Sequence, residues 1–305
     1  MRGLQVRGGA DYACRVLEHE KPKLQIGRVN FVKMNPAGNT TLLVTDVVPR
    51  EQHMELARLL MGPTFLAVEQ VGYVEQAEDS RAAARLQMMG GEFCGNASRA
   101  LAALLVERGA PGISKRTGTG DRWSLKLEVS GSTELLEARV RSLGRARWWT
   151  EISVPVPLRM EVEAEYVRVV MSGIEHLVVE GVDASLASYR RLVKTGAFSP
   201  DVEARGVMFW DPRANQLTPL VVVGDGEPIW ESSCGSGSLA LACRLALTEG
   251  GSIDDLCIHQ PGGELVVDVD SSEGRIRRAV LKGAVDKVAE GTVELPEEPE
   301  SRVAD

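Results

Sequence analysis

Apolar and polar residues alternate along many short segments of this chain, a period of two that is typical of strands buried on one face. The alternation predicts strands in both halves of the chain, at residues 29–34, 41–48, 65–74, 123–129, 135–140, 152–155, 166–171, 175–180, 205–210, 217–224, 264–269 and 275–283. Few segments show the spacing of a helix. The pattern therefore predicts a mixed α/β (α+β) fold in which strands predominate.

Helical spacing is clear in three segments. In residues 50–60, apolar side chains recur every three or four positions. The other two helices, residues 97–108 and a second that ends at Thr248, are each followed by glycine, the residue that most often ends a helix. Both of these helices follow a short segment that contains cysteine and glycine.

The two cysteine segments are copies of one another at an offset of 140 residues. Cys94-Gly-Asn-Ala-Ser-Arg-Ala-Leu-Ala102 and Cys234-Gly-Ser-Gly-Ser-Leu-Ala-Leu-Ala242 are identical at six of nine positions. An internal repeat of this kind indicates two copies of one structural unit. We expect the two units to direct two helix N-termini, each capped by a cysteine, toward a shared cleft.

A cysteine at a helix N-terminus has a specific chemical environment. The first N–H groups of the helix have no partner within the helix and bind anions such as a carboxylate. The same field is expected to lower the thiol pKa from its free value of about 8.5. Gly95 and Gly235 allow a ligand to approach the backbone closely. Cys94 and Cys234 are therefore candidate catalytic residues: one thiolate removes an α-proton while the opposite thiol delivers one, which inverts the carbon.

The alternative for any single cysteine is a small buried hydrophobic residue before a turn. We assign such a structural role to Cys14, Cys243 and Cys257, which have no matching context. For the pair itself a non-catalytic alternative also stays open, a redox-sensing protein with a reversible Cys94–Cys234 disulfide.

Charge and composition argue against several classes of function. The chain has 305 residues, with 35 Lys and Arg against 43 Asp and Glu, a net charge of −8 and no dense basic cluster, so no nucleic-acid partner is expected. Its apolar stretches are too short to cross a bilayer and its start lacks the apolar run of a signal peptide, so we expect no membrane partner and a cytoplasmic protein. Five cysteines without a CxxC pair and four unclustered histidines predict neither a disulfide framework nor a metal site.

Several segments together resemble the cofactor-independent, two-cysteine racemases and epimerases of the diaminopimelate epimerase superfamily, over residues 28–288. Residues 92–98 (Glu-Phe-Cys-Gly-Asn-Ala-Ser) and 233–237 (Ser-Cys-Gly-Ser-Gly) are similar to its two catalytic cysteine motifs. Residues 33–39 resemble its substrate-contacting turn, and residues 171–176 its Gly-x-Pro-His segment. The resemblance implies two pseudosymmetric halves, each a β-barrel-like sheet around a central helix, and a reaction without a cofactor.

The departures from that family concern the substrate. Arg85 stands where true diaminopimelate epimerases have an asparagine some nine residues before the first cysteine, and their Glu-Arg-Gly before the second cysteine is missing. Those groups hold the distal amino-carboxylate of diaminopimelate, and unpartnered polar groups are strongly disfavoured. The sequence is most similar to the histidine racemases that supply D-histidine for opine-type metallophores, which implies histidine as substrate. Diaminopimelate epimerase and proline or hydroxyproline racemase remain the alternatives.

The resemblance and the motifs also indicate which residues surround the substrate. We expect substrate-binding roles for Asn39, Glu69, Gln70, Gly95, Asn96, Gly235 and Ser236. Candidates for a supporting role behind them are Glu92, His176 and Glu231. Several have an ordinary alternative: Asn39 as a turn residue, His176 as a satisfied core histidine, Glu69 and Gln70 as outward strand positions, and Glu92 and Glu231 as solvent-facing carboxylates.

The predicted organisation is an N-terminal extension (1–27), a first half (28–160), a second half (161–288) and a solvated acidic tail (289–305). The expected partner is one small amino acid, and a homodimer is compatible with the sequence. Nothing in this organisation calls for a metal ion or an organic cofactor.

Overall fold

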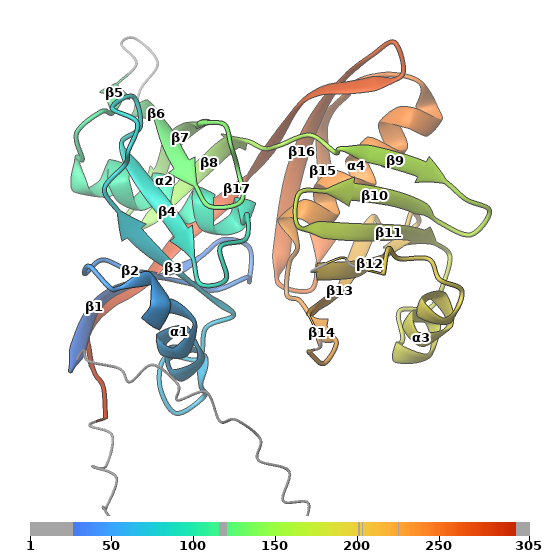
Figure 1. Cartoon of the computed structure of the whole chain (residues 1–305). Coiled ribbons are helices and arrows are strands. Elements are labelled where there is room, and N and C mark those ends of the chain that lie inside the picture. Colours follow the sequence, from blue (N-terminus) through green and yellow to red (C-terminus); the bar gives the residue numbers. More distant parts are fainter. Residues whose placement is uncertain (1–26, 116–120, 201, 203, 225, 297–305) are drawn as a thin grey trace, which may run out of the picture.

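The protein consists of two lobes of mixed strand and helix, joined by one long shared strand (Figure 1). The structure, a computed structural model, describes residues 27–115, 121–200, 202, 204–224 and 226–296. All strands of the described chain are hydrogen-bonded into one continuous network. The predominance of strands over helices that the hydrophobic alternation predicts is confirmed.

The first lobe surrounds α2. Its elements in chain order are β1 (Arg28–Asn35), β2 (Thr41–Val44), the short 3-10 helix η1 (Arg50–Gln52), α1 (His53–Met61), β3 (Gln70–Glu75), β4 (Ala84–Met88), α2 (Gly95–Arg108), β5 (Ser114–Lys115), β6 (Arg122–Val129), β7 (Leu136–Gly144) and β8 (Arg147–Ser153). Pairing runs from β1 through β2, β3, β4, β6 and β7 to β8. The last strand of the chain, β17 (Arg275–Glu294), pairs with both β8 and β1.

The second lobe is arranged around α4. Its elements in chain order are β9 (Arg159–Val162), β10 (Val167–Met171), β11 (Ile174–Glu180), α3 (Leu186–Lys194), β12 (Ala204–Asp211), β13 (Gln216–Val223), β14 (Ile229–Trp230), α4 (Gly235–Glu249), β15 (Ile253–Gln260) and β16 (Gly263–Ser272). Within it β11 and β12 are parallel, whereas β12 with β13 and β15 with β16 are antiparallel. α4 packs against the following strand β16 and against β11, which is distant in sequence.

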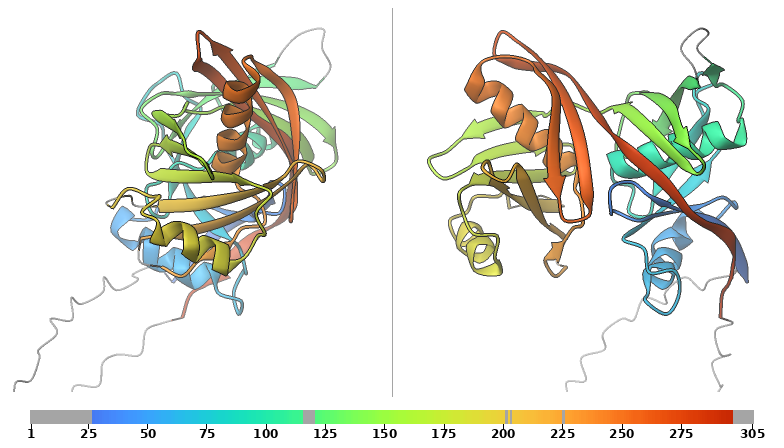
Figure 2. Two further views of the ribbon diagram at one scale, coloured as in Figure 1. Left: turned by 90° about the vertical axis from the view of Figure 1, so that its right-hand side faces the viewer. Right: turned by 180° about the vertical axis from the view of Figure 1, so that it is seen from behind.

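The strand β17 belongs to both lobes. Residues 275–282 pair with β16 in the second lobe, residues 280–286 pair with β8, and residues 286–294 pair with β1 at the start of the first lobe. The view from behind shows this strand running from one lobe across to the other (Figure 2). The two lobes are therefore linked by backbone hydrogen bonds along one strand as well as by the loop between β8 and β9.

The helices α2 and α4 are buried on nearly all sides and are not amphipathic. Residues 95–105 of α2 and residues 237–243 of α4 are all buried. A helix that is apolar all round belongs inside a core, and the small Ala, Gly and Ser side chains allow strands to pack closely around it. One hydrophobic core includes side chains of both helices and of strands from both lobes. This core holds the N-termini of α2 and α4 in fixed positions.

The structure contains elements that the alternation does not predict, among them the strands β4, β9 and β15 and the helix α3. Two predicted strands are shorter than expected, because β2 ends at Val44 and β3 begins only at Gln70. The helix α3 is not among the predicted helices, although five of its nine residues are apolar. Its buried residues Tyr189 and Leu192 are three positions apart and pack within the second lobe, so the sequence does carry a helical signal there.

The C-terminal segment also corrects an expectation. Residues 289–294, expected in the solvated tail, continue β17 and pair with β1, and Leu295 is buried. The acidic side chains of Glu290 and Glu294 remain exposed, so the charge pattern correctly identifies exposed side chains but not the paired backbone beneath them. The extension at 1–26 and the end of the tail at 297–305 lie outside the described residues.

A tight contact joins two loops of different lobes. Gly38, in the turn after β1, has φ +87°, and a Cβ atom there would lie 2.4 Å from the Cα atom of Gly262 in the turn between β15 and β16. Real Cβ contacts are never this short, so the neighbouring backbone would have to move. The absence of a side chain at Gly38 is thus a condition for the two loops to meet.

Replacing Gly38 by alanine tests this contact. Gly109→Ala is the matched control, because Gly109 also has a positive φ of +61° but no atom within 4 Å of the added carbon. We expect Gly38→Ala to lower the free energy of unfolding by about 1–3 kcal/mol more than Gly109→Ala does, since overpacking adds to backbone strain. Urea unfolding of the two variants measures the difference. An equal loss of free energy of unfolding in both variants would show that the two loops do not depend on the close contact between Gly38 and Gly262.

Candidate active site

The helices α2 and α4 begin with the same local structure at a cysteine. The backbone of Cys94 is extended at φ −136° and ψ 110°, and that of Cys234 at φ −121° and ψ 110°. In each case the sulfur accepts a hydrogen bond of 3.4 Å from the amide three residues later, that of Ala97 or Gly237. Both cysteines are therefore N-cap residues with their sulfur atoms at the positive end of a helix.

The two N-termini approach each other across one side chain of β17. A Cβ atom on Gly95 and one on Gly235 would each lie 2.8 Å from the same atom, Cδ2 of Leu281. Asn96 bridges the lobes directly, because its Nδ2 atom donates to the hydroxyl and the carbonyl of Ser233, at 3.3 and 3.4 Å. The structure thus brings the two copies of the cysteine motif together, as the repeat predicts.

A chain of amide groups runs from the interior of α2 to the sulfur of Cys94. Arg99 Nη2 donates to Asn96 Oδ1 at 2.8 Å, and Asn96 Nδ2 donates to Asn39 Oδ1 at 3.1 Å. Gln70 Nε2 donates to the same Asn39 oxygen at 2.7 Å, which leaves Gln70 Oε1 to accept from the Cys94 thiol at 3.1 Å. Each amide in this chain is oriented by the group before it.

Arg99 is the fixed end of this chain. A guanidinium has only donors, so the atom of Asn96 that faces it has to be the oxygen. The Arg99 side chain is completely buried, and burial lowers its pKa to about 10, which still leaves it positively charged at neutral pH. Its Nε atom has no acceptor among the described residues. A buried charge with incomplete hydrogen bonding is costly, which indicates a role beyond packing.

Glu69 connects the same group of residues to the second lobe. Its carboxylate accepts a hydrogen bond from Asn39 Nδ2 at 2.8 Å and another from the hydroxyl of Ser232. The side chain therefore lies in the junction between the lobes, and the alternative of an ordinary outward strand position does not apply to it.

The surroundings of Cys234 are built mainly by the second lobe. Its backbone N–H donates to Gln260 Oε1 at 2.8 Å, and Gln260 Nε2 donates to Ser238 Oγ at 2.8 Å. The hydroxyl of Ser236 lies 3.5 Å from the sulfur and 2.9 Å from Nε2 of His176. The loop that carries Cys234 is thus held on one side by β15 and on the other by β11.

His176 supports this loop but does not reach the sulfur. The ring is completely buried, and burial lowers its pKa to about 3, so the imidazole is neutral near neutral pH. Its Nδ1 atom has no hydrogen-bond partner in the described part of the chain. A ring with this pKa cannot serve as a base near pH 7, and its contact is with Ser236.

Burial corrects the expectation that the helix N-termini lower the thiol pKa values. Burial raises the pKa of Cys94 to about 11, and the hydrogen bond from Ala97, which lowers the pKa, only partly offsets this. For Cys234 burial is again the largest cause of a pKa well above the ordinary value, and the negative charge of Glu231 adds to it. Removing a thiol from water disfavours the thiolate more than the N-terminal amides favour it.

Glu231 is the acidic group beside Cys234. Burial raises the pKa of this carboxyl to about 7, a hydrogen bond with the Cys234 thiol lowers it, and the charge of Glu69 raises it further. The carboxyl therefore changes its protonation state near neutral pH, where it is able to accept a proton from the thiol. The solvent-facing alternative for Glu231 does not fit this position.

The structure assembles most of the predicted residues and leaves one aside. The contacts described above connect seven of the predicted residues to one another or to the thiols: Asn39, Glu69, Gln70, Asn96, His176, Glu231 and Ser236. Glu92 is exposed, and its carboxylate accepts from the amide of Gly90 at 2.9 Å, which fits the solvent-facing alternative. Cys243 is buried within α4, as its structural assignment requires, and Cys14 lies outside the described residues. Cys257 is only partly buried and lies on the outer face of β15, so the expectation of a small buried residue does not hold for it.

Sequence reasoning missed Arg99, Ser232 and Gln260. Arg99 had a visible signal, since the repeat places Leu239 at the matching position and a charge in one copy of an apolar helix needs an explanation. Gln260 had none, because only the pairing of β15 and β16 brings its amide to Cys234.

Comparison with known proteins agrees with this architecture. The family described as the histidine racemase CntK N-terminal domain matches residues 28–294. A histidine racemase of Fusobacterium nucleatum is 32% identical over 89% of this chain and 97% of its own, and one of Staphylococcus aureus is 26% identical over 86% and 96%.

Solved structures of similar fold include a hydroxyproline epimerase of Agrobacterium vitis, with a TM-score of 0.58, 16% identity and coverage of 90% of this chain and 94% of that one. A predicted epimerase of Pseudomonas aeruginosa has a TM-score of 0.60 at 15% identity and covers 88% of this chain and 100% of its own. The sheet-dominated α+β fold is thus the one found in proline racemase and epimerase structures.

The relatives, together with this fold, define the protein as an isomerase of the racemase and epimerase class that acts on a small amino acid. Within that class, the chain belongs to the histidine racemase family. The family match ends at residue 294, which is also where β17 ends. Among the described residues, no helix combines the length and the apolar character needed to cross a membrane.

The neutral, buried state of His176 predicts an acid sensitivity. Its folded-state pKa of about 3 lies below the ordinary value of 6.5, so its contribution to stability is complete above pH 6.5 and is lost as the pH falls from 6.5 toward 3. The loss approaches about 1.4 kcal/mol for each pH unit in this window. We expect His176→Gln, which retains a polar partner for Ser236, to unfold in urea with a weaker pH dependence than the wild type. The prediction would be contradicted if the free energies of unfolding of the two proteins differed by the same amount at every pH between 6.5 and 3.

Proposed function

We propose that the protein interconverts L- and D-histidine by a two-thiol reaction in which Cys94 and Cys234 act on opposite faces of the α-carbon. The observation that carries the proposal is the pair of cysteine-capped helix N-termini that meet across Leu281. The family membership supports the reaction class, and the histidine racemases of two bacteria support the substrate. Neither thiol needs an organic cofactor or a metal ion for this step.

The substrate carboxylate fits between the two helix N-termini. The first N–H groups of α2 and α4 are free of partners within their helices and carry partial positive charge. When the α-proton leaves, negative charge spreads onto the carboxylate, and donors already aimed at it stabilise that charge without rearrangement. The absence of a side chain at Gly95 and Gly235 leaves room for Leu281 between the two N-termini.

The orientation of the amide chain supports a starting proton on Cys94. Because Gln70 Nε2 donates to Asn39, its carbonyl oxygen faces the sulfur, and a carbonyl oxygen forms a hydrogen bond with a thiol but not with a thiolate. Cys94 therefore begins as the proton donor. The raised pKa of its thiol agrees with this assignment.

Cys234 then acts as the base together with Glu231. As the sulfur of Cys234 takes the α-proton, its own S–H proton passes to the Glu231 carboxylate, and Cys94 delivers its proton to the other face of the carbon. The products of this step are the inverted amino acid, a Cys94 thiolate and a neutral Glu231. Transfer of one proton from Glu231 to Cys94, through the site or through water, restores the starting state.

The polar residues at the junction favour a side chain smaller than the distal end of diaminopimelate. Glu69 has its carboxylate in the junction, where it is able to hydrogen-bond an imidazole N–H, and Arg85 forms ion pairs with Glu75 and Glu128 away from the thiols. Proline and hydroxyproline remain alternative substrates because the structural neighbours include a hydroxyproline epimerase.

The same pair of helices bears on the symmetry of the two lobes. We infer that the two lobes are pseudosymmetric halves, each a barrel-like sheet around its central helix. The matched caps of α2 and α4 support this, as does the circuit of strand pairings around α2 that starts at β1 and returns to it through β17.

Serine substitutions test the reaction. Cys94→Ser and Cys234→Ser should each lower racemisation of histidine by about 10²–10⁴-fold or more, because each removes one acid–base group. Cys243→Ser is the matched control in the same helix as Cys234 and should retain activity. D-histidine formed from L-histidine is measured by chiral chromatography without pyridoxal phosphate, and α-proton exchange is measured in deuterium oxide.

Three outcomes would count against this proposal. Full activity in either single variant would remove the two-thiol reaction. Epimerisation of diaminopimelate with no action on histidine would change the substrate but not the chemistry. Absence of exchange with any amino acid, together with a stable Cys94–Cys234 disulfide, would favour the redox-sensing alternative.

The role of Glu231 predicts a pH dependence. In the wild type, kcat/KM should rise as the pH increases through about 7, where Glu231 loses its proton and becomes able to accept that of Cys234. In Glu231→Gln the rise should move to higher pH, toward the range of the unassisted thiol. Glu137→Gln, which removes an exposed carboxylate on β7, is the control and should keep the wild-type profile. Identical profiles for both variants would remove Glu231 from the reaction.

A further inference from the structure

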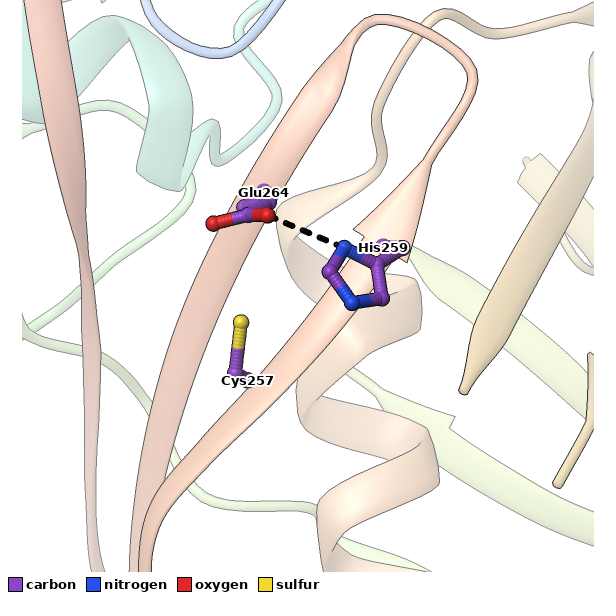
Figure 3. Close-up of side chains that lie close together, drawn as sticks. All are labelled: Cys257, His259 and Glu264. Carbon is purple, nitrogen blue, oxygen red and sulfur yellow. Dashed lines mark ion pairs between the residues drawn. The ribbon is translucent and has the colours of Figure 1, made fainter. Parts of the chain in front are cut away.

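Three side chains with metal-binding atoms lie together on the hairpin formed by β15 and β16 (Figure 3). Cys257 and His259 are two residues apart on β15, so they point to the same face of the strand, and Glu264 on β16 pairs directly with His259. Ile258 and Gln260, which alternate with them, are buried on the opposite face. The three side chains therefore share the outer face of the hairpin, whereas Gln260 reaches Cys234 from the inner face.

The geometry suits a single ion. The ligand atoms of the three side chains all lie within 4.8 Å of one another, and His259 Nδ1 is 3.1 Å from Glu264 Oε1. A zinc ion holds such ligands at about 2.0–2.3 Å, so small side-chain rotations bring all three to one centre. His259 and Glu264 are partly exposed, which leaves a coordination position open to water.

The backbone under these ligands is fixed by one residue from a neighbouring turn. Asn215 Nδ2 donates to the carbonyl of Cys257 at 2.5 Å, and the amide of His259 donates to the carbonyl of Asn215 at 3.0 Å. Both ligand-bearing residues of β15 are thus anchored to the same point. Support of this kind behind the ligands is a usual feature of metal sites, because it sets their spacing before the ion arrives.

The charges of the cluster also favour a cation. Burial and then the negative charge of Glu264 raise the pKa of the Cys257 thiol. A divalent cation between the two groups reverses this effect, since it favours both the thiolate and the carboxylate. Thiolate, imidazole and carboxylate together are a donor set for borderline transition metals such as Zn²⁺ and Co²⁺, whereas Mg²⁺ and Ca²⁺ prefer oxygen donors alone.

We infer that Cys257, His259 and Glu264 bind one divalent transition-metal ion of the zinc type, at a site separate from the two catalytic thiols. The ion would clamp the two strands of the β15–β16 hairpin close to its turn. The tip of this hairpin supports the Cys234 loop, because Gln260 accepts from the Cys234 amide and the amide of Gly262 donates to the Ser232 carbonyl at 2.7 Å. Metal binding would therefore stiffen the support of Cys234 without contacting substrate.

Titration of the full-length protein with Co²⁺ tests the site directly. A cobalt–thiolate bond produces a charge-transfer absorption band, so the spectrum reports whether a cysteine is a ligand. We expect the wild type to develop the band with one ion per chain. Cys257→Ser should abolish it, and His259→Gln and Glu264→Gln should weaken binding by about tenfold or more. Cys243→Ser, which removes a buried thiol of α4, is the matched control and should keep the wild-type band.

Thermal unfolding with Zn²⁺ provides a second readout. An ion that binds only the folded protein raises its melting temperature, so the wild type and Cys243→Ser should be stabilised and Cys257→Ser should not. Circular dichroism without metal verifies that each variant is folded. A cobalt–thiolate band that persists in Cys257→Ser would place the ion on other thiols and overturn the inference. Absence of a band in the folded wild type would also overturn it. Neither result bears on racemisation, which is measured separately.

Discussion

A guanidinium group donates hydrogen bonds and never accepts them, and the first half of the site depends on this property of Arg99. Its contact with Asn96 fixes which atom of that amide faces inward, and the same choice passes through Asn39 to Gln70. At the end of the chain the carbonyl oxygen of Gln70 faces the sulfur of Cys94. In the proposed reaction, a buried cation that lies four hydrogen bonds from Cys94 thereby keeps the proton on a thiol that it does not itself contact.

The two cysteines have the same backbone environment and different side-chain environments. Both are N-caps with matching dihedral angles, yet Cys94 faces a neutral amide and Cys234 faces an ionisable carboxyl. Burial of both thiols opposes ionisation, so the helix field alone does not provide a thiolate at rest. The proposed reaction, which needs one thiol and one base, is served by such an asymmetry, because the carboxyl beside Cys234 would accept the proton that burial would otherwise keep on the sulfur.

Local sequence patterns predict most of the strands and the two cysteine-capped helices, but not the contacts between residues far apart in the chain. The alternation of apolar residues predicts most strands, and the repeat of Cys-Gly segments predicts two helices that begin at paired thiols, because both signals are local. The contacts of Gln260 with Cys234 and of Asn39 with Asn96 join residues far apart in the chain, so no local pattern reports them. The strand at 289–294 is not predicted for another reason: its charged residues indicate exposure to solvent, although its backbone is hydrogen-bonded to β1. Thiol pKa values likewise depend on burial, which spacing alone does not give.

The position of β17 has a consequence for how the protein is made. A ribosome releases the first lobe long before the last strand, yet residues 286–294 form the pairing that completes the network beside β1. The early lobe must therefore wait, with the edges of β1 and β8 unpaired, until β17 has been synthesised. Exposed strand edges are sites of incorrect association between chains. Completion of the first lobe is thus coupled to the synthesis of β17. Loss of only the last few residues of β17 would leave the edge of β1 exposed to mispairing, while β8 would keep its partner at residues 280–286.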